Sequence, residues 1–188
     1  MIINSMGEIM DKEEIREHLR KGNLKFTGSP IASFHVDESL REYLVENGQH
    51  PYAIVVACSD SRVNVEAIFS ASLGDIFVIR SAGNVVLDGE LSSIAYAVKH
   101  LHCHYVLVLG HTHCGAVDSA LKGVDEEELR PLLDDVKAAI KEEVDPRKAE
   151  ILNVRYEMNK IKKAIKTEGL TVDGAVYDIL TGSVEFLD

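Results

Sequence analysis

Short apolar runs alternate with amphipathic stretches along most of the sequence. Residues 52–57, 76–79 and 105–109 form three uncharged apolar runs. Such runs are typical of strands that are buried on both faces of a sheet. Residues 88–101, between the second and third runs, repeat apolar side chains at the spacing of a helix. Buried strands that alternate with helices predict an α/β fold, with a mostly parallel sheet flanked by helices.

The first fifty residues predict two further helices. Asp11 and Glu14 match an N-cap and its capping-box partner, so a first helix begins there, and we expect it to end near Gly22. A second helix is expected over residues 37–47, where Gly48 is placed to cap the C-terminus.

The C-terminal half predicts two more helices and a closing pair of strands. The helices are expected at 125–144, with a restart at Pro131, and at 147–167; the strands are expected at 171–177 and 183–187. No repeat or linker divides the chain, so residues 1–188 are expected to form one domain. Residues 1–30 are expected to be an N-terminal helical arm, because Gly-Ser-Pro at 28–30 separates them from the body.

Composition and charge narrow the class of protein. The 188 residues are 46% apolar and 27% charged, the mixture of a soluble globular domain rather than of a disordered segment. Asp and Glu number 31 against 20 Lys and Arg, a net charge of −11, so no nucleic-acid partner is expected. No apolar run approaches the length of a membrane span, and no secretory signal is visible. The 3 cysteines are therefore expected to be reduced, in a cytoplasmic protein.

Residues with metal-binding side chains follow two of the predicted strands. Cys58 comes directly after the first apolar run, and His111 and Cys114 follow the third. Ligands of open parallel sheets bind beyond the carboxyl ends of the strands, so these side chains converge if the two strands are neighbours. Two thiolates and one imidazole suit Zn²⁺, and three protein ligands are typical of a catalytic zinc site. From spacing alone, buried structural cysteines and a thiol or redox site are the alternatives, although no Cys-x-x-Cys motif is present.

Asp60 and Arg62 lie close to Cys58 in the sequence. The Asp60 carboxylate is a candidate for the fourth position on the metal. Arg62 can hold the same carboxylate through a charge-assisted hydrogen bond. Asp60 therefore has two competing partners, the metal ion and the guanidinium.

A second group of residues offers metal-binding side chains, but in a less favourable arrangement. Cys103 lies among His100, His102 and His104, between a predicted helix end and a strand start. Alternate side chains diverge there, so we do not expect these residues to bind a metal. His113 alternates away from the predicted zinc ligands and is not expected to join them.

The motifs closely resemble those of the β-class carbonic anhydrases. The paired motifs are Cys-Ser-Asp-Ser-Arg at 58–62 and Gly-His-x-x-Cys-Gly at 110–115. Further segments that resemble the family lie at 20–26, 74–80, 82–84, 173–178 and 181–182. The resemblance implies four parallel strands with an added edge strand. It also implies a homodimer as the minimal unit, in which the N-terminal helices embrace the partner, with assembly into a tetramer left open.

The resemblance implies roles for individual residues as well. Cys58, His111 and Cys114 would hold one Zn²⁺ per subunit, and Asp60 with Arg62 would form the catalytic dyad. The implied reaction is the reversible hydration of CO₂ to bicarbonate and a proton by water that zinc activates. In the plant-type members water occupies the fourth zinc position, so we expect an open site at neutral pH with the aspartate turned to the arginine.

The substrate pocket is implied by the same resemblance. Gln49, Phe77 and Tyr96 match pocket positions of the plant-type members, with Gln49 contributed by the partner subunit. Ala82 departs from this pattern, because those members carry a bulkier valine there.

Two other functions stay open at this stage. One is a related zinc hydrolase of another small heterocumulene, CS₂ or COS, which access to the pocket would decide. The other is a non-catalytic zinc-binding protein. The pair of Asp60 and Arg62 argues against the second, because a structural zinc site needs neither residue.

Overall fold

The fold is built on a five-stranded sheet with the strand order β4-β3-β5-β6-β7. The computed structural model describes residues 2–3, 9–28 and 37–188. The strands are β3 (Ala53–Cys58), β4 (Ile76–Ser81), β5 (Tyr105–His111), β6 (Thr171–Tyr177) and β7 (Val184–Phe186). The first four are parallel, and β7 pairs antiparallel with β6 at the edge. The predicted α/β class, with four parallel strands and an added edge strand, is confirmed.

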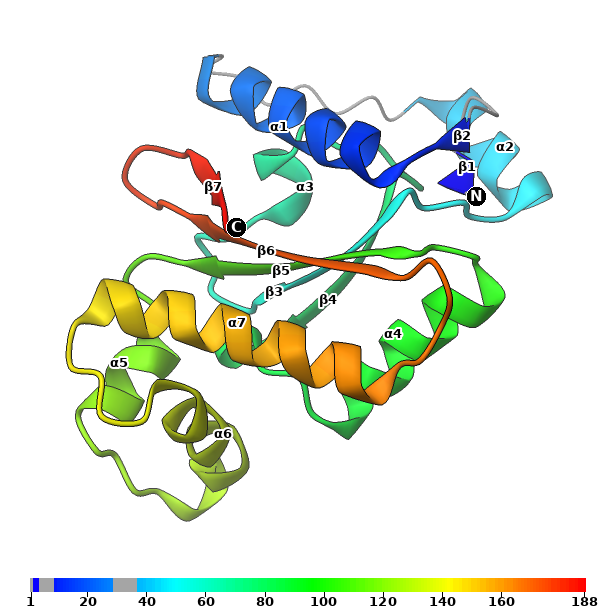
Figure 1. The fold of residues 1–188 in the computed structure, drawn as a ribbon. Coiled ribbons are helices and arrows are strands. Elements are labelled where there is room, and N and C mark those ends of the chain that lie inside the picture. Colours follow the sequence, from blue (N-terminus) through cyan, green and yellow to red (C-terminus); the bar gives the residue numbers. More distant parts are fainter. Residues whose placement is uncertain (1, 4–8, 29–36) are drawn as a thin grey trace.

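Helices cover both faces of this sheet (Figure 1). They are α1 (Lys12–Gly28), α2 (Glu38–Asn47), α3 (Val65–Ile68), α4 (Asp88–His100), α5 (Gly115–Leu121), α6 (Arg130–Ile140) and α7 (Pro146–Ala164). Two 3₁₀ turns, η1 (Ala82–Asn84) and η2 (Glu127–Leu129), and a small ribbon of β1 (Ile2–Ile3) and β2 (Ile9–Met10) complete the elements. None of the helices in this described part of the chain has the length and apolar character that crossing a bilayer requires.

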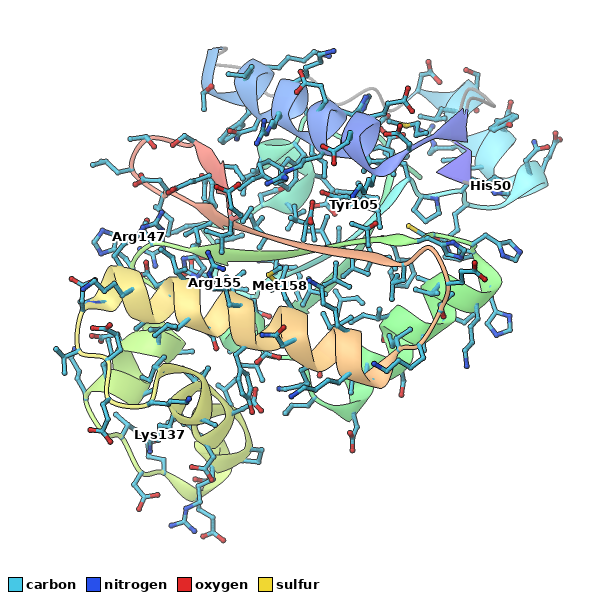
Figure 2. The ribbon with its side chains drawn as sticks, viewed as in Figure 1. His50, Tyr105, Lys137, Arg147, Arg155 and Met158 are labelled. Atoms are coloured by element: carbon cyan, nitrogen blue, oxygen red, sulfur yellow. The ribbon has the colours of Figure 1, made fainter. Side chains whose placement is uncertain are left out.

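The core is divided by the sheet. Helices α1 and α3 pack on one face, where Tyr105 is fully buried with Ile15 and Leu19. Helices α4 and α7 pack on the other face, where Met158 covers a second apolar cluster. Tyr105 and Met158 are labelled in Figure 2 on opposite sides of the strands. Burial on both faces explains why the strands are continuous apolar runs.

Helix α1 is longer than expected. The predicted capping box is present, since Asp11 accepts from the backbone N–H of Glu14 and Glu14 accepts from that of Asp11. The helix does not end near Gly22 but continues to Gly28. A Cβ atom at Gly22 would lie 1.9 Å from the carbonyl oxygen of Phe69, the residue that follows α3. Gly22 therefore allows two helices to pack closely and is not a stop signal.

The region after the third buried strand also departs from the prediction. In place of one helix over 125–144, the structure has the 3₁₀ turn η2 followed by α6. Pro131 lies in the first turn of α6, so the predicted restart is present. Helix α6 ends at Ile140 because Lys141 turns to a φ of +53°. The last helix ends at Ala164, three residues before the predicted end. Helices α3 and α5 were not predicted, because four and seven residues are too few to show a helical period.

The predicted N-terminal arm carries α1, and its apolar face is buried within the same chain. Ile15 and Leu19 have no exposed surface. Asn23 donates to the carbonyl oxygens of Ile68 and Gly182, which ties the helix to α3 and to the turn before β7. Ser29 and Pro30, the end of the predicted break, lie outside the described residues.

Candidate metal centre

The three predicted ligands converge at the carboxyl ends of two central strands. Strands β3 and β5 are neighbours, with Ala57 level with Leu109. Both strands run slightly further than predicted, so Cys58 and His111 are their last residues. Cys114 is the N-cap residue of α5. In the strand order, the chain continues from β3 to β4 in one direction and from β5 to β6 in the opposite direction. The three residues therefore lie at the switch point between β3 and β5, where such sheets bind ligands.

The donor set fits a zinc ion. The ligand atoms of Cys58, His111 and Cys114 all lie within 4.8 Å of one another, and all three residues are buried. His111 uses Nδ1 in a 2.9 Å hydrogen bond with the carbonyl oxygen of Thr112. Its Nε2 atom is buried and has no hydrogen-bond partner among the described residues. A buried ring nitrogen without a partner, beside two sulfurs, is the arrangement that a metal satisfies.

The thiols of Cys58 and Cys114 differ in their pKa. The thiol of Cys114, the His111 ring and the backbone N–H groups of Asp60 and Gly83 lower the pKa of Cys58 to about 4. Those N–H groups lie 3.4 and 3.2 Å from the Cys58 sulfur. The neighbouring Cys58 thiolate and burial raise the pKa of Cys114. A divalent cation stabilises both thiolates, so its binding would release the proton that the pair retains.

Asp60 and Arg62 form a two-point ion pair beside this group. The guanidinium donates from Nε to one carboxylate oxygen at 2.9 Å and from Nη2 to the other at 2.6 Å. These bonds from Arg62 hold the pKa of Asp60 well below its ordinary value. Arg62 also donates to the carbonyl oxygen of His113 at 3.1 Å. It thereby links the loop after β3 to the loop after β5.

Arg80 holds the same loop from the edge strand, and the sequence did not single it out. Its Nε atom donates to the carbonyl oxygen of Cys58 at 3.2 Å, and its Nη2 to that of Asp60 at 2.8 Å. The signal was a charged residue directly after the apolar run at 76–79. Arg62 and Arg80 therefore both hold the backbone around Cys58, His111 and Cys114, which we call the metal group.

The predicted pocket residues fall into two places. Ala82 follows Ser81, which is paired with Cys58, so it lies at the metal end of the sheet. Phe77 is four residues before Ser81 on β4, about 13 Å along a strand, and its ring centroid is 6.4 Å from that of Tyr96. Gln49 precedes β3, at the opposite end of the strand from Cys58. The metal group of the same chain is therefore not lined by Gln49, Phe77 or Tyr96.

Cys103, the remaining cysteine, is part of the apolar core on the α4 and α7 side of the sheet. Cys103 is fully buried, burial raises its pKa to about 12, and its thiol contacts the carbonyl oxygen of Tyr105. Within the described part of the chain, the group of Cys58, His111 and Cys114 is the one that is arranged to hold a metal.

The chain is similar to known carbonic anhydrases. The family model for carbonic anhydrase matches residues 53–184. A carbonic anhydrase of Mycolicibacterium smegmatis is 33% identical over 186 residues, which cover 89% of each chain. The β-carbonic anhydrase CafA of Aspergillus fumigatus has 30% identity and a TM-score of 0.68, covering 80% of this chain and 83% of that one. A tetrameric β-carbonic anhydrase of Sordaria macrospora has 28% identity and a TM-score of 0.64, covering 79% and 91%.

Two cysteines and one histidine at the switch point of a mostly parallel sheet are a ligand set that is typical of zinc enzymes. Together with the match over most of its length, this shows that the chain belongs to the β-carbonic anhydrase family.

Proposed function

We propose that the chain catalyses the reversible hydration of CO₂ to bicarbonate at one zinc ion, bound by Cys58, His111 and Cys114. The observation that carries this proposal is the unpartnered Nε2 atom of His111 beside the two buried sulfurs. Zinc bound there would supply a Lewis acid that makes water a nucleophile near neutral pH. Membership in the β-carbonic anhydrase family supports CO₂ as the substrate.

Asp60 is proposed to orient the reacting water. Its carboxylate stays ionised because Arg62 holds its pKa low, so it can accept a hydrogen bond throughout the neutral range. Both carboxylate oxygens are engaged by the guanidinium. Arg62 would therefore keep Asp60 from becoming a fourth ligand, which leaves that position to water.

The apolar part of the pocket is proposed to come from a second copy of the chain. Strand β4 is an edge of the sheet, and Phe77 and Tyr96 lie together beside it. Tyr96 is 48% exposed, although an aromatic ring gains from burial. A homodimer that joins these edges would bring Gln49, Phe77 and Tyr96 to the partner's zinc site. Assembly into a tetramer has a precedent in the tetrameric Sordaria macrospora protein.

The location of the protein is proposed to be the cytoplasm. Cys58, Cys103 and Cys114 are all free thiols. The proposed site needs two of them as thiolates, and a reducing compartment keeps thiolates from forming disulfides.

The substrate is tested by offering the zinc-loaded protein CO₂, COS and CS₂ in separate assays. Stopped-flow hydration of CO₂ should be fast, and release of sulfide from COS or CS₂ should be slow or absent. Efficient sulfide release with little CO₂ hydration would assign the site to the other heterocumulenes. Full zinc content without turnover on any of the three would show a non-catalytic zinc protein.

A further inference from the structure

Helix α7 carries a stripe of polar side chains on a face that is turned into the protein. Asn153, Glu157 and Lys160 are spaced four and three residues apart, so they share one side of the helix. Asn153 and Glu157 have no exposed surface. Burying polar groups costs free energy unless they form hydrogen bonds, so their partners indicate what the stripe is for.

All three side chains bind the backbone of the loop between β4 and α4. Asn153 donates from Nδ2 to the carbonyl oxygen of Gly83 at 2.8 Å. Glu157 accepts from the N–H of Val86 at 3.1 Å, and Lys160 donates to the carbonyl oxygen of Val86 at 2.9 Å. These contacts hold a loop whose own backbone contributes a long hydrogen bond, from the N–H of Val85 to the carbonyl oxygen of Ala82 at 3.5 Å.

Gly83 connects this loop to the metal group. Its N–H donates to the sulfur of Cys58 at 3.2 Å, while its carbonyl oxygen accepts from Asn153. Its φ of +66° favours glycine, and a Cβ atom there would lie 2.9 Å from the side chain of Ala116. A single residue in a restricted conformation thus joins Asn153 to a zinc ligand.

The carbonyl oxygen of the Asn153 side chain supports the importance of the bond to Gly83. This Oδ1 atom is buried and has no hydrogen-bond partner in the part of the chain that the structure describes. An apolar side chain of similar size would avoid that cost. The bond to Gly83 is therefore the interaction that accounts for an amide at this position.

We propose that Asn153 is a positioning residue for the metal centre, acting through Gly83 on the sulfur of Cys58. By fixing Gly83, it keeps an N–H group directed at the thiolate. A hydrogen bond to a thiolate withdraws charge that the sulfur would otherwise donate to the metal, and partners outside the ligand set tune metal sites in this way. The inference rests on the proposed zinc site and adds a residue that controls the donor strength of one ligand.

The test uses the full chain loaded with Co²⁺, because cobalt thiolates have an absorption band from sulfur-to-metal charge transfer. In Asn153→Leu, the freed thiolate becomes a stronger donor, so the band should move to longer wavelength. Zinc affinity should nevertheless fall by about 10- to 100-fold, the usual cost of losing such a partner, because the loop beside Cys58 is no longer held in place. The pH profile of CO₂ hydration should move to higher pH, because a more electron-rich zinc acidifies water less.

The matched control is Ile161→Val, at a buried position two turns further along α7 and in the apolar cluster. This variant should lose some stability and keep the wild-type band, zinc affinity and pH profile. If Asn153→Leu does not fold, Asn153→Ser is the second variant; its shorter side chain should not reach Gly83, so the same shift is expected.

The two hypotheses fail in different ways. A cobalt band that survives unchanged in Cys58→Ser would overturn the proposed metal site itself. With that site intact, an Asn153 variant whose band, zinc affinity and pH profile equal those of Ile161→Val would overturn the role of Asn153.

Discussion

Asp60 and Arg62 are joined by two parallel hydrogen bonds, in which Nε and Nη2 of the guanidinium each donate to a different carboxylate oxygen at 2.9 and 2.6 Å. A backbone N–H of Arg62 adds a third bond to the carboxylate at 2.9 Å. This geometry fixes the plane of the carboxylate and leaves the aspartate little freedom to turn toward the sulfurs. Two-point pairing of this kind needs arginine, because lysine offers a single charged point.

Removal of the guanidinium should lower turnover without removing the metal. In Arg62→Ala, Asp60 loses its anchor and becomes free to bind zinc in place of water. We expect CO₂ hydration to fall by about 10²- to 10⁴-fold, the range for loss of a catalytic proton-transfer partner, while zinc content stays full. Stopped-flow rates and metal analysis of the same sample check this. Asp60→Asn should also be slow, but with water still able to reach the metal, so a crystal structure of each variant separates the two causes. Wild-type turnover in Arg62→Ala would show that the pair has no part in catalysis.

Metal content should depend on two of the three cysteines. Cys58→Ser and Cys114→Ser each remove a thiolate donor, so zinc content and activity should both fall to background. Cys103→Ser is the matched control, because Cys103 is as buried as the other two but lies outside the metal group. Its zinc content should stay at one per chain, measured by elemental analysis after dialysis. Loss of zinc from the Cys103 variant alone would mean that the wrong cysteines were assigned.

A charge at the β4 edge should separate the subunits and stop the reaction together. Tyr96→Glu places a carboxylate in the proposed apolar interface, so we expect a monomer in light scattering, full zinc content and little CO₂ hydration. Val144→Glu is the control, since Val144 is also an exposed apolar residue but lies between α6 and α7. A monomeric Tyr96 variant that hydrates CO₂ at the wild-type rate would contradict a pocket shared between subunits.

The free energy of unfolding should fall as pH rises from about 4.5 to 8, because of the buried carboxyl group of Glu157. Burial, and then the neighbouring Asp135, raises the pKa of Glu157 from 4.5 to about 8, although Lys160 lies 3.0 Å away and partly offsets this. Between these pH values the folded chain holds a proton that the unfolded chain releases, so this group lowers the free energy of unfolding as pH rises.

Glu157→Gln imitates the protonated form and should remove this dependence. The free energy of unfolding of the variant, relative to wild type, should rise between pH 5 and 8 by at most about 1.4 kcal/mol per pH unit. Denaturant titrations of both proteins at several pH values measure the difference. Parallel curves across the range would show that Glu157 is ionised in the folded protein.

The buried strands and the metal group follow directly from the sequence, for physical reasons. A strand covered on both faces must be apolar throughout, so the runs at 52–57 and 105–109 identify the sheet. The predicted ligands follow those runs, and the parallel arrangement of the strands brings Cys58, His111 and Cys114 together at the carboxyl ends of β3 and β5.

The residues that support the metal group could not be predicted in this way. Asn153 occupies a polar position in an amphipathic helix, and such positions are usually solvated. Gly83 lies in a three-residue turn without periodicity. Their roles depend on which face of α7 meets the loop after β4, and only the packing of the whole chain determines that.

The central claim is that one zinc ion, held by the three buried ligands, hydrates CO₂. Its most direct test is to remove the metal with a chelator, return Zn²⁺ in steps and follow CO₂ hydration by stopped flow. Activity should rise linearly and level off at one zinc per chain, and Cys58→Ser should recover none. A chain that hydrates CO₂ without zinc, or that binds one zinc ion and never becomes active, would contradict the account.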